Sequence, residues 1–263
     1  MTPRALAKYW LYNSVPGFRG RFPYFGTRIF FPKDALLLYA VCDQGIFEAD
    51  VVQRMVKLVR PGSVVIDVGA NLGLMSVPVL QACASCRVVS FEPSPSSLPY
   101  LERTAADSAH RDRWTVVGKA VGDRAGELDF VVGSQRDALY EGFRSGDRIA
   151  GGRAIKVPVT TLDEEWRTWG EPDVSLIKID VEGGEAAVMN GAAALMERRH
   201  PAILVEWFAQ YLARFDTKPE ELLRIAERYQ YRIFTVPAGV PVDDERALQA
   251  QMIDCQNFML LNG

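Results

Sequence analysis

The ten residues 64–73 read V-V-I-D-V-G-A-N-L-G, and this stretch decides the fold. Its apolar start is rich in β-branched residues, which is typical of a parallel strand covered by helices on both faces. Gly69 and Gly73 follow, and glycine permits a tight turn and close approach of the backbone to a ligand. Apolar residues at 72–82 then predict a helix. Strand, turn and helix N-terminus together indicate a nucleotide-binding corner at the carboxyl edge of a sheet.

Further apolar runs on both sides of this corner predict more strands. They lie at residues 87–91, 114–121, 174–180, 202–205, 231–236 and 257–261. Helical patterns separate most of them, and a clear one covers residues 49–59. Because strands alternate with helices, we predict one α/β domain with a doubly wound, mostly parallel seven-stranded sheet. A two-stranded excursion at 128–132 and 155–159 encloses a Gly- and Arg-rich loop at 133–153.

The first 45 residues are crowded with aromatic side chains, and prolines and glycines interrupt them, so this segment is not one long helix. We predict an N-terminal cap at residues 1–45, packed on the main α/β domain at residues 46–263. A lid or wall over an acceptor pocket is the alternative, because aromatic rings stack on flat or ring-shaped ligands. A homo-oligomer with this segment at its interface is also compatible with the pattern.

Composition excludes several classes of protein. The net charge of −3 argues against a nucleic-acid protein with a broad basic face. We find no apolar run long enough for a membrane span and no secretory signal, so we expect a cytoplasmic protein. Four cysteines are too few and too scattered for a disulfide framework.

The glycine pattern also narrows the choice of nucleotide. A dinucleotide corner counted from Gly69 needs glycines at positions 71 and 74, which hold Asn71 and Leu74. This argues against NAD or FAD, although a nicotinamide-dependent oxidoreductase and a nucleotide-binding non-enzyme stay as alternatives. An adenosine ligand without a pyrophosphate suits the corner better. Glu92, at the tip of the next strand, is placed as the acidic partner of a ribose diol.

Five sequence blocks in order resemble FkbM-type methyltransferases: D-V-G-A-N-L-G, S-F-E-P-S-P, V-P-V-T-T-L-D, I-K-I-D-V-E-G-G-E and P-A-I-L-V-E. The resemblance covers residues 47–236. It implies a class I methyltransferase fold of the Rossmann-like type, with S-adenosylmethionine as the methyl donor. It further implies O-methylation of a hydroxyl on a sugar, glycolipid or natural product, so the partner is a small-molecule or saccharide acceptor. The implied donor-binding residues are Asp67, Gly69, Asn71, Gly73, Glu92, Asp123 and Glu48, with Asp123 expected at the adenine.

A methyl group on a sulfonium is already activated, so such an enzyme mainly aligns the acceptor and removes its proton. Asp180 and Glu206 end two strands that we expect to be adjacent, and should therefore face one crevice. Lys178 lies on the same face as Asp180 because side chains alternate along a strand. The two carboxylates could share a Mg²⁺ that binds the acceptor oxygen, or one could act as a general base. Asp180 holding the amino group of the donor is the alternative.

Overall fold

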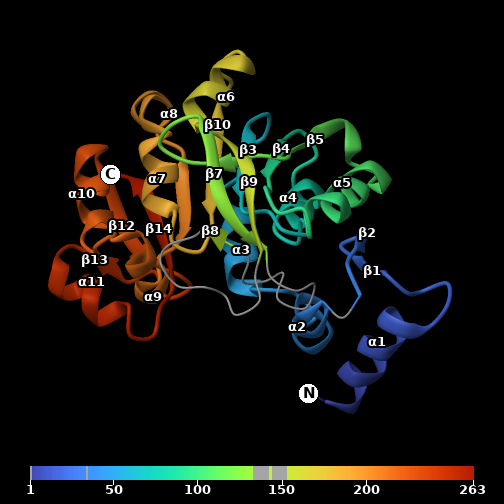
Figure 1. Ribbon diagram of the computed structural model, residues 1–263. Helices are drawn as coiled ribbons and strands as arrows, with labels where there is room; N and C mark the ends of the chain where they lie inside the picture. Colours follow the sequence, from blue (N-terminus) through green and yellow to red (C-terminus); the bar gives the residue numbers. More distant parts are fainter. Residues whose placement is uncertain (1, 34, 133–141, 144–152) are drawn as a thin grey trace.

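The computed structural model describes residues 2–33, 35–132, 142–143 and 153–263. Its main sheet has eight strands in the order β13-β12-β14-β11-β10-β3-β4-β5 (Figure 1). The bounds are β13 Pro241–Val242, β12 Tyr231–Thr235, β14 Asn257–Asn262, β11 Ala202–Glu206, β10 Val174–Ile179, β3 Val64–Val68, β4 Arg87–Phe91 and β5 Trp114–Val117. The predicted number of seven was wrong by one strand, because the two-residue edge strand β13 has no apolar run of its own.

The direction of the strands agrees with a mostly parallel sheet. Neighbours from β11 through β10, β3 and β4 to β5 pair in parallel. Strand β14 runs antiparallel to both β11 and β12, so β12 has the direction of β11. The predicted doubly wound α/β architecture is therefore confirmed, with β14 and β13 reversed.

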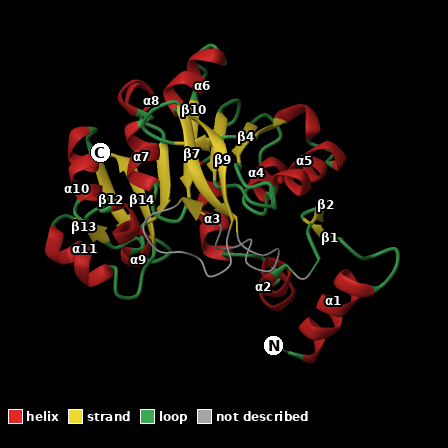
Figure 2. Ribbon diagram, in the orientation of Figure 1, coloured by secondary structure: helices red, strands yellow, loops and turns green. Residues whose placement is uncertain are grey.

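Helices cover both faces of this sheet (Figure 2). They are α1 Pro3–Ser14, α2 Leu36–Gln44, α3 Ala49–Leu58, α4 Ser76–Ala82, α5 Leu98–Asp107, α6 Leu162–Thr168, α7 Glu185–Asn190, α8 Ala193–Arg199, α9 Ala209–Leu212, α10 Glu221–Arg228 and α11 Glu245–Gln251, with short 3₁₀ turns η1 Arg111–Arg113 and η2 Ala213–Phe215. Val64 and Ile66 of β3 pack in one cluster with α6, α7, α8 and α10, whereas Val65 packs with α3, α4 and α5. This alternation explains why β3 is buried at every position and apolar at every position except Asp67.

A second sheet stands beside the main one, in the order β6-β9-β7-β8. Its strands are β6 Ala120–Val121, β7 Gly126–Val132, β8 Gly142–Phe143 and β9 Arg153–Thr160. The predicted single strand at 114–121 was wrong, because β5 ends at Val117 and β6 pairs with β9 instead. Most of the Gly- and Arg-rich loop at 133–153 lies outside the described residues.

The N-terminal segment contributes a hairpin, β1 Arg21–Tyr24 and β2 Thr27–Phe30, which contacts α5. Arg28 forms two hydrogen bonds to the Asp107 carboxylate, at 2.7 and 2.6 Å. Phe22 and Phe31 belong to the same apolar cluster as the helices on that face. The segment thus packs on the sheet domain, and its division at residue 46 stays a prediction. In the part of the chain that the structure describes, every helix is too short or too polar to cross a membrane.

The turn between β3 and α4 differs from the predicted helix at 72–82. Asn71 has φ +49° and Gly73 has φ +84°, and neither value is helical, so α4 begins only at Ser76. Pro78 consequently lies in the first turn of α4. Backbone N–H groups in the first turn have no partner within the helix, so a proline is tolerated there. The kink that a proline would cause deeper in a helix is therefore not expected here.

Gly69 provides a prediction about stability. It has φ +79°, and a Cβ there would lie 1.8 Å from the backbone oxygen of Asp180, at the end of the neighbouring strand. We expect Gly69→Ala to lower the free energy of unfolding by roughly 3 kcal/mol or more, measured by denaturant titration. Gly17→Ala is the control, since Gly17 has φ +86° in open space. Equal effects of the two changes would refute the steric argument.

Candidate active site

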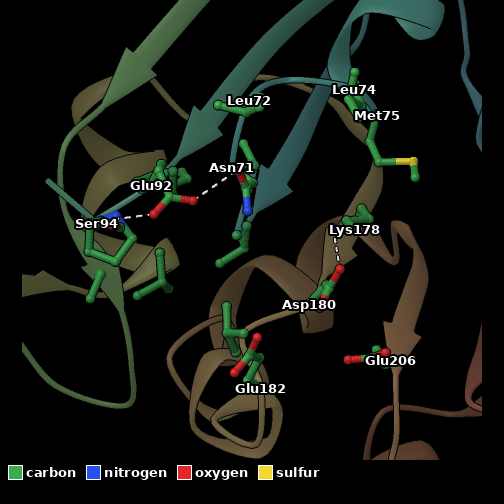
Figure 3. Close-up of a pocket in the computed structure, with 18 of the residues that line it drawn as sticks. Asn71, Leu72, Leu74, Met75, Glu92, Ser94, Lys178, Asp180, Glu182 and Glu206 are labelled. Atoms are coloured by element: carbon green, nitrogen blue, oxygen red, sulfur yellow. Dashed lines mark hydrogen bonds and ion pairs between the residues drawn. The ribbon is translucent and has the colours of Figure 1, made fainter. Parts of the chain in front are cut away.

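A cavity of about 320 Å³ opens at the carboxyl ends of β3, β4, β10 and β11. This volume is within the range of small-molecule sites. Its charged lining residues, among those described, comprise five carboxyls and two ammonium groups: Glu48, Glu92, Asp180, Glu182, Glu206, Lys119 and Lys178. Figure 3 shows Glu92 and Ser94 on one side of the hollow and Asp180 and Glu206 on the other. The excess of carboxyls favours a ligand that carries positive charge.

Glu92 follows β4 and is held by the backbone. Its two oxygens accept hydrogen bonds from the N–H groups of Asn71 and Ser94, both at 2.8 Å (Figure 3). The first bond ties Glu92 to the turn after β3, because Asn71 lies at the centre of that turn. Glu92 is only 6% exposed, and it lines the cavity. A carboxylate held in this way by backbone N–H groups is a strong hydrogen-bond acceptor of the kind that binds hydroxyl groups.

Lys178 is the buried cation of the site. Its Nζ lies 2.9 Å from Oδ2 of Asp180 and 3.9 Å from Oδ1 of Asp67. Burial alone would lower the pKa of Lys178, but the carboxyls of Asp180, Asp67 and Glu48 outweigh it and raise the pKa. Lys178 is therefore a permanent ammonium that stabilises negative charge on Asp180.

Asp180 and Glu206 are neighbours because β10 and β11 pair in parallel, with Ile179 opposite Val205. Burial, the charge of Asp180 and a hydrogen bond with Asp180 together raise the pKa of Glu206 to about 9. Burial and the charge of Asp180 likewise raise the pKa of Glu48. Glu206 consequently keeps its proton at neutral pH, because ionisation would place a second buried negative charge in the cavity.

Glu185 fixes the turn that follows β10. Its Oε1 accepts hydrogen bonds from the N–H groups of Val181, at 3.2 Å, and Gly183, at 2.9 Å. The side chain is buried, and burial raises its pKa to about 7. The turn thereby holds Val181 and Glu182 in the cavity wall.

The residues present do not suit the Mg²⁺ that the sequence left open. Within the described ranges, no three His, Cys, Asp or Glu side chains gather as a metal site. The physical reason is the ammonium of Lys178, which already occupies the place of a cation beside Asp180. We therefore derive no metal-dependent step.

The structure brings most of the predicted site residues together. The cavity is lined by Glu48, Gly69, Asn71, Glu92, Lys178, Asp180 and Glu206. Asp67 lies beneath it, fully buried, with Oδ2 accepting a 2.6 Å hydrogen bond from the hydroxyl of Ser76 at the start of α4. A Cβ on Gly73 would meet the ring of Trp114 at 2.7 Å, so this glycine serves packing.

Asp123 was expected at the adenine, but it is exposed and lines a second hollow that Gly126 and Phe215 share. The predicted strand at residues 114–121 extends beyond the observed end of β5. Because that strand ends at Val117, the residues that reach the main cavity are Lys119, Ala120 and Val121. Gly118, directly after Val117, is the residue that could have indicated from the sequence that the strand ends here. Tyr211 of α9 was also missed, and its sequence context gives no comparable signal.

Glu206 makes the stability of the fold depend on pH. Its pKa rises from an ordinary 4.5 to about 9 on folding, so the folded chain keeps a proton that the unfolded chain loses between these values. This stabilisation is complete below pH 4.5 and is lost as pH rises toward about 9. We expect Glu206→Gln to flatten the fall in the free energy of unfolding over this window, measured by urea titration. Glu197→Gln, at an exposed position, is the control that should keep the wild-type slope.

Comparisons with known proteins bear on this site. The methyltransferase FkbM domain family matches residues 67–233, which run from the end of β3 into β12. The methyltransferase sdnD of Sordaria araneosa is 27% identical over 154 residues, 48% of this chain and 59% of the relative. The chain thus spans about three fifths of the length of that curated relative.

Solved structures give weaker likenesses. A methyltransferase FkbM from Methylobacillus flagellatus KT is 16% identical with a TM-score of 0.48, covering 85% of this chain and 53% of that chain. A precorrin-6y C5,15-methyltransferase from Geobacter metallireducens GS-15 is 10% identical with a TM-score of 0.46, covering 83% and 91%. The family match includes Asp67, Glu92, Asp180 and Glu206.

Proposed function

This chain belongs to the methyltransferase FkbM domain family, and we propose on that premise that it transfers a methyl group from S-adenosylmethionine to a hydroxyl of a sugar, glycolipid or natural product. The family membership favours this function over a nicotinamide-dependent oxidoreductase or a nucleotide-binding protein without activity. The observation that carries the proposal is the pairing of Asp180 and Glu206 in the same cavity as the backbone-held Glu92.

The donor end of the cavity suits S-adenosylmethionine. Glu92 would accept hydrogen bonds from both ribose hydroxyls, as acidic residues at this position do in related folds. Gly69 and Asn71 line the cavity, and no glycine is present where a pyrophosphate would need one. The carboxyls around Asp180 and Glu48 favour the positive charges of the sulfonium and the amino group.

The acceptor end has a candidate base, and the described residues around it form no metal site. When bound, S-adenosylmethionine supplies an activated methyl group for in-line displacement. Asp180 would take the proton from the acceptor O–H as the O–CH₃ bond forms and the S–CH₃ bond breaks, with S-adenosylhomocysteine as the leaving group. Lys178 and Glu206 would hold Asp180 in place. A general base of this kind typically accelerates a reaction by about 10²–10⁴-fold.

The experiment is a screen with methyl-labelled S-adenosylmethionine over sugars, glycolipids and polyketide-type alcohols. We expect label on an oxygen of one class, identified by product mass and NMR, at a rate that EDTA does not change. Label on nitrogen or carbon would overturn the O-methyl assignment. Loss of activity with EDTA and recovery with Mg²⁺ would overturn the assignment of Lys178 as the cation of the site.

A further inference from the structure

Helix α1 presents an apolar face to solvent. Pro3, Leu6, Ala7 and Trp10 are exposed and follow the i, i+3, i+4, i+7 spacing of one helix face. Leu6 is 53% and Trp10 is 63% exposed, whereas Ala5 on the opposite face is buried. A surface helix normally turns polar residues toward solvent. An exposed apolar face on α1 therefore indicates an interaction surface.

Further exposed rings lie around this helix. Phe18, in the turn that follows α1, is 51% exposed. Tyr39 of α2 is 42% exposed, and its ring contacts that of Tyr9 with centroids 6.1 Å apart. Figure 1 shows α1 at the rim of the molecule, next to α2 and away from the edge of the sheet. The exposed rings thus extend the apolar face beyond α1.

The charge of this segment differs from that of the whole chain. Residues 1–33 contain six Lys and Arg and no Asp or Glu, although acidic residues outnumber basic ones 33 to 30 overall. These cations are Arg4, Lys8, Arg19, Arg21, Arg28 and Lys33. Across the ranges that the structure describes, Arg28 alone of the six forms an ion pair. A cationic segment with unpaired charges is complementary to a surface of fixed negative charge.

We propose that this N-terminal face, with Leu6, Trp10 and Phe18 as its apolar residues and the neighbouring Arg and Lys as its charges, docks on an anionic lipid bilayer. Interfacial helices combine Trp and Leu on one side with Lys and Arg beside them, and anionic headgroups attract the cations. A symmetric contact with a second copy would instead bring two cationic surfaces together. The inference needs neither donor nor acceptor, so it stands apart from the proposed function.

The test is co-sedimentation of the full chain with vesicles of phosphatidylglycerol and phosphatidylcholine, and with vesicles of phosphatidylcholine alone. We expect binding to the first kind, and about tenfold weaker binding for the double variant Leu6→Ser/Trp10→Ser. Ile253→Ser is the matched control, because Ile253 is 80% exposed on a distant part of the chain. All five tryptophans are described and only Trp10 is exposed, so a blue shift of the emission on binding reports this residue.

Charge is tested with Arg4→Glu/Lys8→Glu, which should weaken binding to the anionic vesicles, and with Arg246→Glu on α11, which should not. Failure of the wild-type chain to bind anionic vesicles would overturn the proposal. Equal binding to both kinds of vesicle would overturn the role of charge. A dimer in analytical ultracentrifugation that Leu6→Ser/Trp10→Ser dissociates, without vesicle binding, would assign the face to a second copy instead.

Discussion

Asp180→Asn is expected to lower the rate of methyl transfer by about 10²–10⁴-fold, because the amide cannot take the proton of the acceptor. Asparagine keeps the shape of the side chain, and the backbone N–H of Asp180 still donates to the carbonyl of Val68. The fold should therefore survive. The measurement is the single-turnover rate with labelled donor, together with the midpoint of thermal unfolding.

Two readouts separate the roles that Asp180 could have. If it is the base, kcat falls and the affinity for S-adenosylhomocysteine stays within a few fold. If it holds the amino group of the donor, the affinity falls as well. Asp173→Asn is the control, since Asp173 pairs with Arg60 at the opposite end of β10. A fully active Asp180→Asn variant would remove Asp180 from the chemistry.

Glu92→Ala is expected to weaken the binding of S-adenosylhomocysteine by about 10²-fold. The estimate counts two charge-assisted hydrogen bonds to the ribose at roughly 1.5 kcal/mol each. The variant also frees the N–H groups of Asn71 and Ser94, so its unfolding must be measured beside its affinity. Isothermal titration calorimetry provides the comparison.

Asp123→Asn is the matched control for Glu92. Sequence reasoning placed Asp123 at the adenine, whereas the structure places it on a separate hollow. We expect Asp123→Asn to bind S-adenosylhomocysteine as the wild type does. A loss of affinity at Asp123 but not at Glu92 would show that the donor lies elsewhere.

Much of the site geometry could be predicted because it follows from regular strands. Side-chain alternation places Lys178 beside Asp180, and parallel pairing of β10 with β11 places Glu206 near both. Glu92 was found in the same way, as the residue that directly follows β4. In each case the strand pattern alone fixes which side chains reach the sheet edge.

The errors arise where no periodic pattern exists. Nothing in the sequence shows that Asn71 adopts a left-handed conformation, and this is what delays α4 to Ser76. The break at Gly118 moves the residues after β5 into a second sheet and leaves Asp123 outside the main cavity. The Mg²⁺ hypothesis depended on counting carboxylates, whereas the contact of Lys178 with Asp180 became visible only in three dimensions.

The measurement that tests the central claim most directly is calorimetric titration of the wild-type chain with S-adenosylhomocysteine and, separately, with NADH. We predict one binding site for S-adenosylhomocysteine, weakened in Glu92→Ala, and no binding of NADH. Absence of S-adenosylhomocysteine binding, or tight binding of NADH in its place, would contradict the account.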